Sequence, residues 1–343
     1  MNQVLGYLAR RLVTSVITLL VLTLIIFTMV KVIPGDEAHV AAGVSATPEQ
    51  VAAMRTHLGL DRSLPVQYFE FLDRLIHGDL GTSISSHSSI AAGIWEVLPQ
   101  TIELVLMAML IMILVAVPAA VFSALRSDRG SDTAVRAAVI MSAGLPTFWL
   151  ALVAQYVLST KLGWFPISGA LAPHVRIPRV TGFTLIDTLL NSNPNAFIDG
   201  LHHLLLPAIV LALPFTGQLY RTLRTDMIGV LDSEYIDAAR AKGVPAAALV
   251  RRHLLPNSAG AALTVIGATF SMMVGAAVLV ESVFGLNGIG AYLTNAVANS
   301  DRLAVVGAVL VIGVLVVASS FAIDVIQLIR DPRIRAGQLA SVT

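Results

Sequence analysis

Long apolar runs alternate with polar stretches along the chain, and six of these runs are long enough to cross a bilayer as helices. A transmembrane helix needs about 20 predominantly apolar residues. The third run is interrupted by Gly144-Leu-Pro146, where we expect a kink. The pattern predicts an all-α polytopic membrane protein with six transmembrane helices, at residues 12–30, 98–125, 137–162, 201–219, 259–280 and 303–329.

The first run follows Arg10-Arg11 and leads into Ile33-Pro-Gly-Asp36. A signal peptide has a shorter apolar region and a cleavage site flanked by small residues. We therefore interpret the run as a retained anchor. The chain then divides into a tail and first helix (1–31), a long extracytoplasmic domain (32–97), a five-helix core (98–335) that includes a cytoplasmic loop at 223–257, and a C-terminal tail (336–343). A second outer loop, at 163–200, offers no recognisable motif.

The basic residues predict the orientation of the chain in the membrane. With both termini in the cytoplasm, 14 of the 22 Lys and Arg residues lie on the inner side, where the loops are also short. Short cytoplasmic loops are enriched in Lys and Arg. An arrangement with both termini inside is thus the consistent one. The fifth helix also contains Gly260, Gly267 and Gly275, which would permit close helix packing.

Composition supports a membrane protein and excludes several kinds of site. Only 13% of residues are charged and 56% are hydrophobic, whereas about a quarter of a soluble protein is charged. The absence of cysteine excludes disulfides, cysteine metal sites and thiol nucleophiles. The basic residues form no patch with aromatics, so no nucleic-acid partner is expected. The chain has no Gly-x4-Gly-Lys-Ser/Thr motif, so it lacks the loop that binds the phosphates of ATP. Residues 285–290 have the glycine spacing of a dinucleotide-binding motif, but they are not in the βαβ unit that such a motif requires.

Ionisable residues near membrane depth are candidates for function because they are costly in lipid. We expect Asp324 to form a helix-end ion pair with Arg330, with a role in a pathway as the alternative. We expect Glu103 and Glu281 to be interfacial, with pore lining as the alternative. His202 and its neighbour His203 would point about 100° apart on a helix, so they make a poor metal site. No catalytic set and no metal site is predicted.

A polar, basic island at 232–256 separates the fourth and fifth runs. Asp232 can N-cap a short helix, and Lys242 with Gly243 can end it. Pro245 suits the first turn of a second short helix, and Pro256 is expected to mark its end. The alanines of the first helix, Ala238, Ala239 and Ala241, would let another protein approach closely. An ordinary surface loop is the alternative.

The spacing in this island resembles the coupling-loop signature of ABC importer permeases, which is Glu-Ala-Ala, three residues, Gly, nine residues, Ile, one residue, Leu-Pro. Here Asp237 replaces Glu and His253 replaces Ile, while Gly243 and Leu255-Pro256 match. Other blocks, in order, resemble the peptide/nickel branch of these permeases, and the long first outer loop resembles its "B" subunit. The blocks are Arg10-Arg11 to Asp36, Leu58 to Tyr68, Gly78 to Gly81, Leu98 to Leu104, Ala238 to Gly243, Phe284 to Gly290, and Asp331 to Arg335.

The resemblance implies a type I ABC importer permease in the bacterial cytoplasmic membrane, forming half of a pore for di- or oligopeptides. Its implied partners are a homologous second permease, two ATPase subunits that hold ATP and Mg, and an extracytoplasmic solute-binding protein. No cofactor and no enzymatic activity is expected on this chain. Nickel chelates or glutathione as substrates, and a stand-alone ion-coupled carrier, stay open. The implied ATPase-coupling residues are Tyr235, Asp237, Ala238, Ala239, Arg240, Lys242, Gly243, Leu255 and Pro256.

Overall fold

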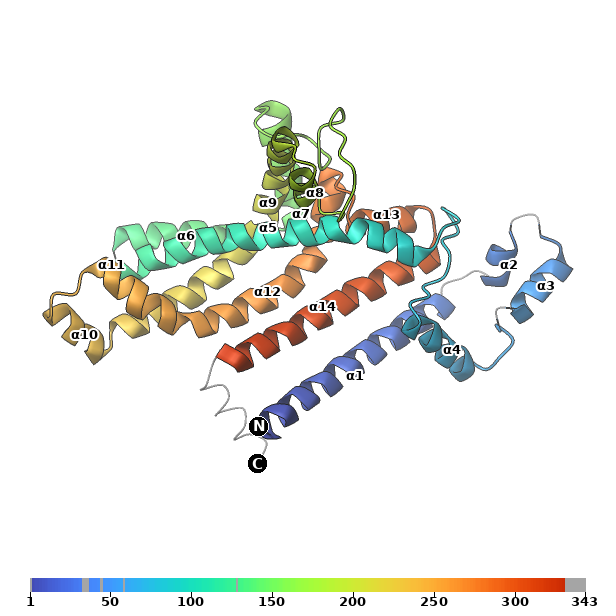
Figure 1. Cartoon of the computed structure of the whole chain (residues 1–343), viewed down its shortest axis with the longest axis horizontal. Coiled ribbons are helices and arrows are strands. Elements are labelled where there is room, and N and C mark those ends of the chain that lie inside the picture. The colour runs from blue at the N-terminus through green and yellow to red at the C-terminus, as the bar shows by residue number, and fades with distance from the viewer. Residues whose placement is uncertain (1, 33–36, 44–45, 58, 128, 331–343) are drawn as a thin grey trace.

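The structure, a computed structural model, describes residues 2–32, 37–43, 46–57, 59–127 and 129–330 (Figure 1). Within these ranges the regular structure is helical, apart from an isolated antiparallel bridge between Thr82 and Ser89. The predicted all-α class is therefore confirmed. Two of the sequence blocks discussed above, 33–36 and 331–335, and the predicted tail at 336–343 lie outside the described residues.

Within the described residues, five helical segments are long and apolar enough to cross a membrane, and a bent helix pair makes a sixth if it is counted as one span. The fourth segment begins with a short α-helix and a π-helical turn, which run without a break into the long helix. The five are α1 (Asn2–Val32), α5 (Ile90–Leu125), α9 (Pro194–Leu231), the run formed by α11 (Ala246–Leu249), Val250–Leu254 and α12 (Leu255–Phe284), and α14 (Arg302–Arg330).

The bent pair occupies the position of the predicted third span. Helix α6 (Gly130–Ala143) meets α7 (Thr147–Ala154) at 100°, and a π-helical turn at Gln155–Lys161 continues α7. Gly144 ends the first helix and Pro146 precedes the second. Since the residue before a proline is disfavoured in helical conformation, the chain must turn here. The predicted break is confirmed, but α6 begins well before residue 137, so the helix includes residues 130–136, which the apolar run did not mark.

Two helices begin earlier than their apolar runs because local caps extend them. The Ser89 hydroxyl accepts the Ala92 N–H at 3.4 Å, so α5 begins at Ile90 and not at residue 98. The Asn193 side chain accepts the Ala196 N–H at 3.0 Å, and Pro194 occupies the first turn of α9. Both are ordinary N-terminal signals. Hydropathy alone marks only the apolar part of each helix.

The main core lies where α5, α9 and α12 pack together (Figure 1). Small side chains on the facing surfaces let α5 and α9 approach closely, as is common between membrane helices. A smaller core joins the beginnings of α5 and α14 to α13 (Ile289–Ala298). Among the fully buried side chains of the main core are Leu104, Ala108, Met112, Ala116, Leu211, Leu219, Tyr220 and Met273.

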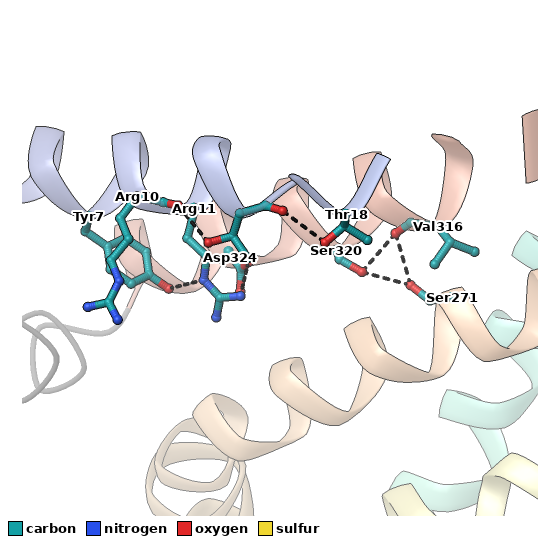
Figure 2. A network of polar contacts seen from close by, with 9 residues as sticks. Tyr7, Arg10, Arg11, Thr18, Ser271, Val316, Ser320 and Asp324 are labelled. Carbon is teal, nitrogen blue, oxygen red and sulfur yellow. Dashed lines mark hydrogen bonds and ion pairs between the residues drawn. The ribbon is translucent and has the colours of Figure 1, made fainter. Parts of the chain in front are cut away.

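Helix α1 stands outside this core and packs on α14, where an ion pair links the two helices (Figure 2). The Arg11 guanidinium lies 3.1 Å from the Asp324 carboxylate and donates to the Tyr7 hydroxyl at 3.2 Å. One helical turn earlier on α14, the Ser320 hydroxyl lies 3.2 Å from that of Ser271 on α12. Asp324 therefore pairs with a base on the first helix, whereas the side chain of Arg330, its expected partner, lies outside what the structure describes.

The remaining helices are short. An outlying arm contains α2 (Glu37–Ala42), α3 (Pro48–His57) and α4 (Leu64–Ile76), at the right of Figure 1. Between α7 and α9 lies α8 (Thr184–Leu190), and α10 (Glu234–Ala241) follows α9 at the far left. The arm and α10 thus lie at opposite ends of the molecule.

Candidate coupling site

The candidate site is the hairpin of α10 and α11, which links α9 to α12 (Figure 1). Because α9 and α12 both belong to the main core, the hairpin is attached directly to two of the three helices on which the fold depends. The predicted island at 232–256 is therefore confirmed as a short helical projection between two membrane helices.

The beginning of α10 differs by one residue from the expectation. Ser233, with φ −85° and ψ 142°, occupies the N-cap position, and its side chain makes no capping hydrogen bond. Asp232 instead ends α9, where its backbone N–H donates to Ile228 and Val230. The expected Asp232 cap is wrong because the long helix continues through Leu231 and uses Asp232 as its own terminus.

The end of α10 agrees with the expectation. Gly243 has φ +77°, in the left-handed region that favours glycine. Its N–H donates to the Arg240 carbonyl at 2.9 Å, and the Val244 N–H donates to the Ala239 carbonyl at 3.1 Å. This pair of bonds is the Schellman motif, which ends a helix and turns the chain back. The prediction of a left-handed C-cap at Gly243 is confirmed.

One face of α10 is held by the core and the other is open. Ile236 is fully buried and belongs to the main core, whereas Ala239 is half-buried. The exposed Asp237 accepts a hydrogen bond at 3.2 Å from the Arg240 guanidinium one turn later. The sequence reasoning missed Ile236, although it is the one large aliphatic residue of α10. The other exposed residues of the predicted set on this helix and its cap are Tyr235, Ala238, Lys242 and Gly243.

Leu255 and Pro256 lie apart from this exposed face, at the start of α12. Leu255 is half-buried against the main core and Pro256 is exposed. Pro256 does not end a helix, contrary to expectation, because the π-helical turn at Val250–Leu254 comes immediately before it. Such a turn already departs from the α-helical bonding pattern, so the missing N–H of proline is accommodated there.

Tyr235 connects the two parts of the predicted set. Its hydroxyl accepts a hydrogen bond from the Asn257 side chain at 3.4 Å, and its ring lies 5.9 Å from that of His253. The Asn257 amide also donates to the His253 carbonyl at 2.6 Å. The structure therefore brings α10 against the beginning of α12 through Tyr235.

A buried polar cluster near the hairpin end of the core was missed from the sequence. Asp132, 1% exposed, pairs with Arg224 on α9, whose Nε lies 3.0 Å from the carboxylate. Ser123 on α5 also donates to Asp132, and its hydroxyl lies 2.6 Å from that of Tyr220. A buried ion pair needs such added hydrogen bonds to offset desolvation. The cluster joins α5, α6 and α9. The signal in the sequence that could have revealed it is Asp132, an acid close to the apolar run that begins at residue 137.

At the opposite end of α12, Glu281 is fully buried within the protein. Its carboxylate accepts the Gly290 N–H at 2.7 Å, while the Thr101 hydroxyl on α5 accepts the neighbouring Ile289 N–H at 2.8 Å. A Cβ at Gly288 would lie 2.3 Å from the carboxylate, so only glycine fits there. The glycines at 285–290 thus allow the loop to fold over Glu281, which explains the spacing that imitates a dinucleotide fingerprint.

The outer loop at 163–200 is also organised by buried carboxylates. Glu103, which is 8% exposed, accepts the N–H groups of Thr184 and Leu185 at 2.9 and 2.8 Å and so holds the start of α8. Of the two histidines, His202 contacts the Trp164 carbonyl through Nε2 at 2.8 Å, and His203 contacts the Asp199 carbonyl through Nδ1 at 2.8 Å. The two imidazoles therefore have separate partners.

Asp187 organises the segment just before α8. Burial raises the pKa of the Asp187 carboxyl, but hydrogen bonds from the Thr181 hydroxyl and from the backbone N–H groups of Thr181, Gly182 and Val180 outweigh burial. The net pKa lies below the ordinary value. Asp187 is therefore held in its charged form as the acceptor that closes this turn.

The fold and the hairpin define a polytopic membrane protein of the transport-permease class. Residues 116–336 match the family model described as the binding-protein-dependent transport system inner membrane component. Residues 4–105 match the model of the N-terminal region of membrane components of such systems. The chain belongs to the family of binding-protein-dependent transport system inner membrane components, which confirms the resemblance found in its sequence.

The chain is also similar over nearly its whole length to characterised relatives. A di/tripeptide transport system permease of Pseudomonas aeruginosa is 35% identical over 96% of this chain and 99% of its own length. A dipeptide transport system permease of Alkalihalophilus pseudofirmus is 32% identical over 96% of this chain and 99% of its own. A probable D,D-dipeptide transport system permease of Escherichia coli is 36% identical over 91% and 92%.

Proposed function

We propose that the chain is the pore-forming permease subunit of an ATP-driven importer of di- or oligopeptides in the bacterial cytoplasmic membrane, with both termini in the cytoplasm. The peptide substrate is supported by the names of the three relatives above, each of which is a dipeptide or di/tripeptide transport permease. In the proposed division of the chain, residues 32–97 are extracytoplasmic, 98–335 form the transmembrane core and 223–257 form the coupling loop. The partners are a homologous second permease, two ATPase subunits and an extracytoplasmic solute-binding protein.

The observation that supports coupling is the attachment of the hairpin. The exposed face of α10 combines the short side chain of Ala238 with polar side chains, so the flat surface of another protein can approach the helix closely at the alanine. Its opposite face is anchored by the fully buried Ile236. In the proposal an ATPase subunit contacts Tyr235, Asp237, Ala238, Ala239, Arg240, Lys242 and Gly243, while Leu255 and Pro256 hold the start of α12. A movement of the ATPase then displaces α9 and α12 together.

The contacts of the acids near membrane depth favour this proposal over a stand-alone ion-coupled carrier. Such carriers place ion-binding groups near the bilayer midplane, in broken helices. Here Asp324 pairs with Arg11, Glu103 accepts backbone N–H groups of α8, and Glu281 accepts that of Gly290. Each of these acids therefore has a structural contact. Nickel chelates or glutathione are the alternative substrates for the same proposed importer.

The decisive experiment is affinity purification of the tagged chain from its own membranes in mild detergent. Recovery of a second permease, ATPase subunits and a solute-binding protein is expected, and the binding protein then identifies the substrate by direct binding of peptides, nickel chelates or glutathione. Recovery of the chain alone, together with uptake that persists without any ATPase, would contradict the importer and favour the ion-coupled carrier.

Site-directed cross-linking tests the coupling surface itself. Because the chain has no cysteine, Ala238→Cys supplies a single exposed thiol on α10. A thiol-to-amine cross-linker should join this variant to an ATPase subunit. The matched control is Ser88→Cys, an exposed position in the proposed extracytoplasmic region 32–97, which should give no ATPase adduct. An equal adduct from both positions would remove the support for the coupling surface.

A further inference from the structure

Helix α4 is amphipathic, yet the structure leaves its apolar face uncovered. Its apolar residues recur at intervals of three and four, which places them on one side of the helix. None of its 13 residues is buried. Phe69 is 68% exposed and Ile76 is 83% exposed. The apolar face consists of Leu64, Tyr68, Phe69, Phe71, Leu72, Leu75 and Ile76, and the polar face includes Gln67, Glu70, Asp73 and Arg74.

One edge of the apolar face is attached to α1. The rings of Tyr68 and Phe71 lie 5.4 and 5.8 Å from the ring of Phe27. The Tyr68 hydroxyl lies 3.0 Å from the Thr23 hydroxyl and donates to the Leu20 carbonyl at 3.2 Å. These contacts fix α4 beside α1 and leave the other edge, with Phe69 and Ile76, pointing away from it.

The contacts with α1 also give the depth of α4 in the membrane. The apolar span of α1 extends from Gly6 to Met29. With a rise of 1.5 Å per residue, Leu20 lies about 14 Å inward from Met29 along the helix. Tyr68 therefore reaches from α4 well into the apolar span, and Phe27, which both aromatic rings contact, lies just inside its outer end. Helix α4 sits at the level of the outer part of the bilayer.

Several side chains on the polar face of α4 have polar partners in the same region of the chain. The Gln67 amide donates to the carbonyls of Leu60 and Arg62 at 3.1 and 2.7 Å, and Arg62 forms an ion pair with Glu70. The side chain of Asp73 is 74% exposed. Polar groups thus lie on one side and the uncovered apolar side chains on the other, as in helices that lie in a membrane interface.

We propose that α4 lies in the outer interface of the bilayer, with Phe69 and Ile76 inserted among lipid acyl chains. Isolated helices shorter than about 12–15 residues are marginal in water, so a 13-residue helix without buried residues needs a covering surface. Figure 1 shows α4 on the side of α1 away from α14. The apolar span of α1 also exposes large side chains, such as Leu24 and Ile25, and the bilayer that covers α1 also covers α4.

The test compares positions of similar exposure on the two faces. Phe69→Cys and Ile76→Cys report on the apolar face, and Asp73→Cys is the matched control on the polar face. Each single thiol of the otherwise cysteine-free chain is labelled with an environment-sensitive fluorophore. The full chain is reconstituted into phosphatidylcholine–phosphatidylglycerol nanodiscs, alone and with the proteins that co-purify with it. All three substitutions are at exposed positions, so the yield of monodisperse protein should equal that of the parent chain.

We expect blue-shifted emission at 69 and 76, with loss of fluorescence when the lipids carry brominated acyl chains and none with aqueous iodide. The label at 73 should show the reverse. Quenching by iodide at all three positions would overturn the proposal, because it would place α4 in water. Protection of 69 and 76 from both quenchers, with or without the co-purifying proteins, would also overturn it, because a protein surface would then cover the helix. Neither result depends on which substrate the chain transports.

Discussion

At the scale of single residues, Gly243 connects a backbone conformation to the proposed coupling. A residue with a side chain in the left-handed conformation costs about 1–2 kcal/mol. A Cβ at Gly243 would meet no atom within 4 Å, so backbone strain alone would oppose a substitution. We expect Gly243→Val to lower peptide uptake by about tenfold, the equivalent of ~1.4 kcal/mol, while the amount of assembled complex stays unchanged.

The control for this prediction is Gly243→Asn, because asparagine tolerates the left-handed region. The asparagine variant should retain most of the uptake. Uptake is measured with a labelled dipeptide in cells, and assembly is measured by co-purification. Normal uptake by the valine variant would contradict the idea that α10 acts as a rigid element.

Asp187 leads to a prediction about pH. Its folded-state pKa is lowered, and the value in the unfolded chain is about 3.9. The hydrogen-bonded carboxylate therefore stabilises the fold fully above about pH 4, and this contribution is lost as the pH falls through the folded-state pKa. We expect Asp187→Asn to lower stability at pH 7 by about 1–3 kcal/mol and to have a smaller effect below pH 4.

This pH dependence is measured by thermal unfolding of the detergent-purified chain at pH 7 and below about pH 4. Asp232→Asn, at an exposed position, is the control and should leave the unfolding temperature unchanged at pH 7. A deficit in Asp187→Asn that grows as the pH falls would contradict the sign of the argument.

Residue-level features were predictable where they depend on local conformation. The left-handed cap at Gly243 follows from one glycine after a helical stretch, and the structure has it there. The partner of Asp324 was not predictable, because Arg11 lies on the first helix and only the packing of α1 on α14 brings the two together. The same holds for Asp132 and Arg224, which are far apart in sequence and adjacent in space.

At the scale of helices, hydropathy located the spans but not their ends. The caps at Ser89 and Asn193 extend α5 and α9 beyond their apolar parts, because a helix is limited by its hydrogen bonds and not by the thickness of the hydrocarbon. The Gly144-Leu-Pro146 break was predictable, but its 100° angle was not. The angle depends on how α6 and α7 each pack on α9, and the sequence pattern does not contain that information.

Two glycines of α12 make a matched test of helix packing. A Cβ at Gly267 would lie 2.3 Å from the Ile323 side chain on α14, whereas a Cβ at Gly275 would meet nothing within 4 Å of this chain. Close packing is therefore confirmed at Gly267 and is not seen within this chain at Gly275. We expect Gly267→Ala to destabilise the chain by about 1–3 kcal/mol and Gly275→Ala to have little effect.

The readout is the thermal unfolding temperature of the purified chain. Because the clash involves the Cγ2 and Cδ1 atoms of one side chain, Ile323→Ala in the Gly267→Ala background should restore part of the loss. Equal destabilisation by both alanine variants would argue against the contact between α12 and α14, because alanine has the higher helix propensity and should be tolerated at the open position.

At the scale of the whole molecule, the proposed orientation predicts which positions are accessible from each side of the membrane. Ser88→Cys and Asn195→Cys lie in the proposed outer regions, and Ala247→Cys lies in the proposed cytoplasmic hairpin; all three positions are exposed. In spheroplasts, a membrane-impermeant maleimide should label the first two variants only. In inside-out vesicles it should label the third only. The reverse pattern would invert the orientation.

The molecule as a whole was predictable in its class and order of spans, and in its resemblance to a permease family. What the sequence lacked was the arrangement of the parts. Nothing in the apolar pattern indicates that α5, α9 and α12 form the core while α1 stands outside it. Nor does the amphipathic pattern of α4 indicate that this helix rests against α1.

The position of α1 has a consequence for biosynthesis. Its packing partner within the membrane, α14, is the last of the described helices to be made, and the ion pair between Arg11 and Asp324 closes only when α14 has entered the bilayer. Until then the first helix stays in lipid beside the growing chain, and the Arg11 guanidinium near its beginning has no contact with Asp324. If synthesis stops before α14 is made, α1 has no packing partner that connects it to the core. Formation of the α1–α14 contact therefore distinguishes a chain that includes α14 from one that ends before it.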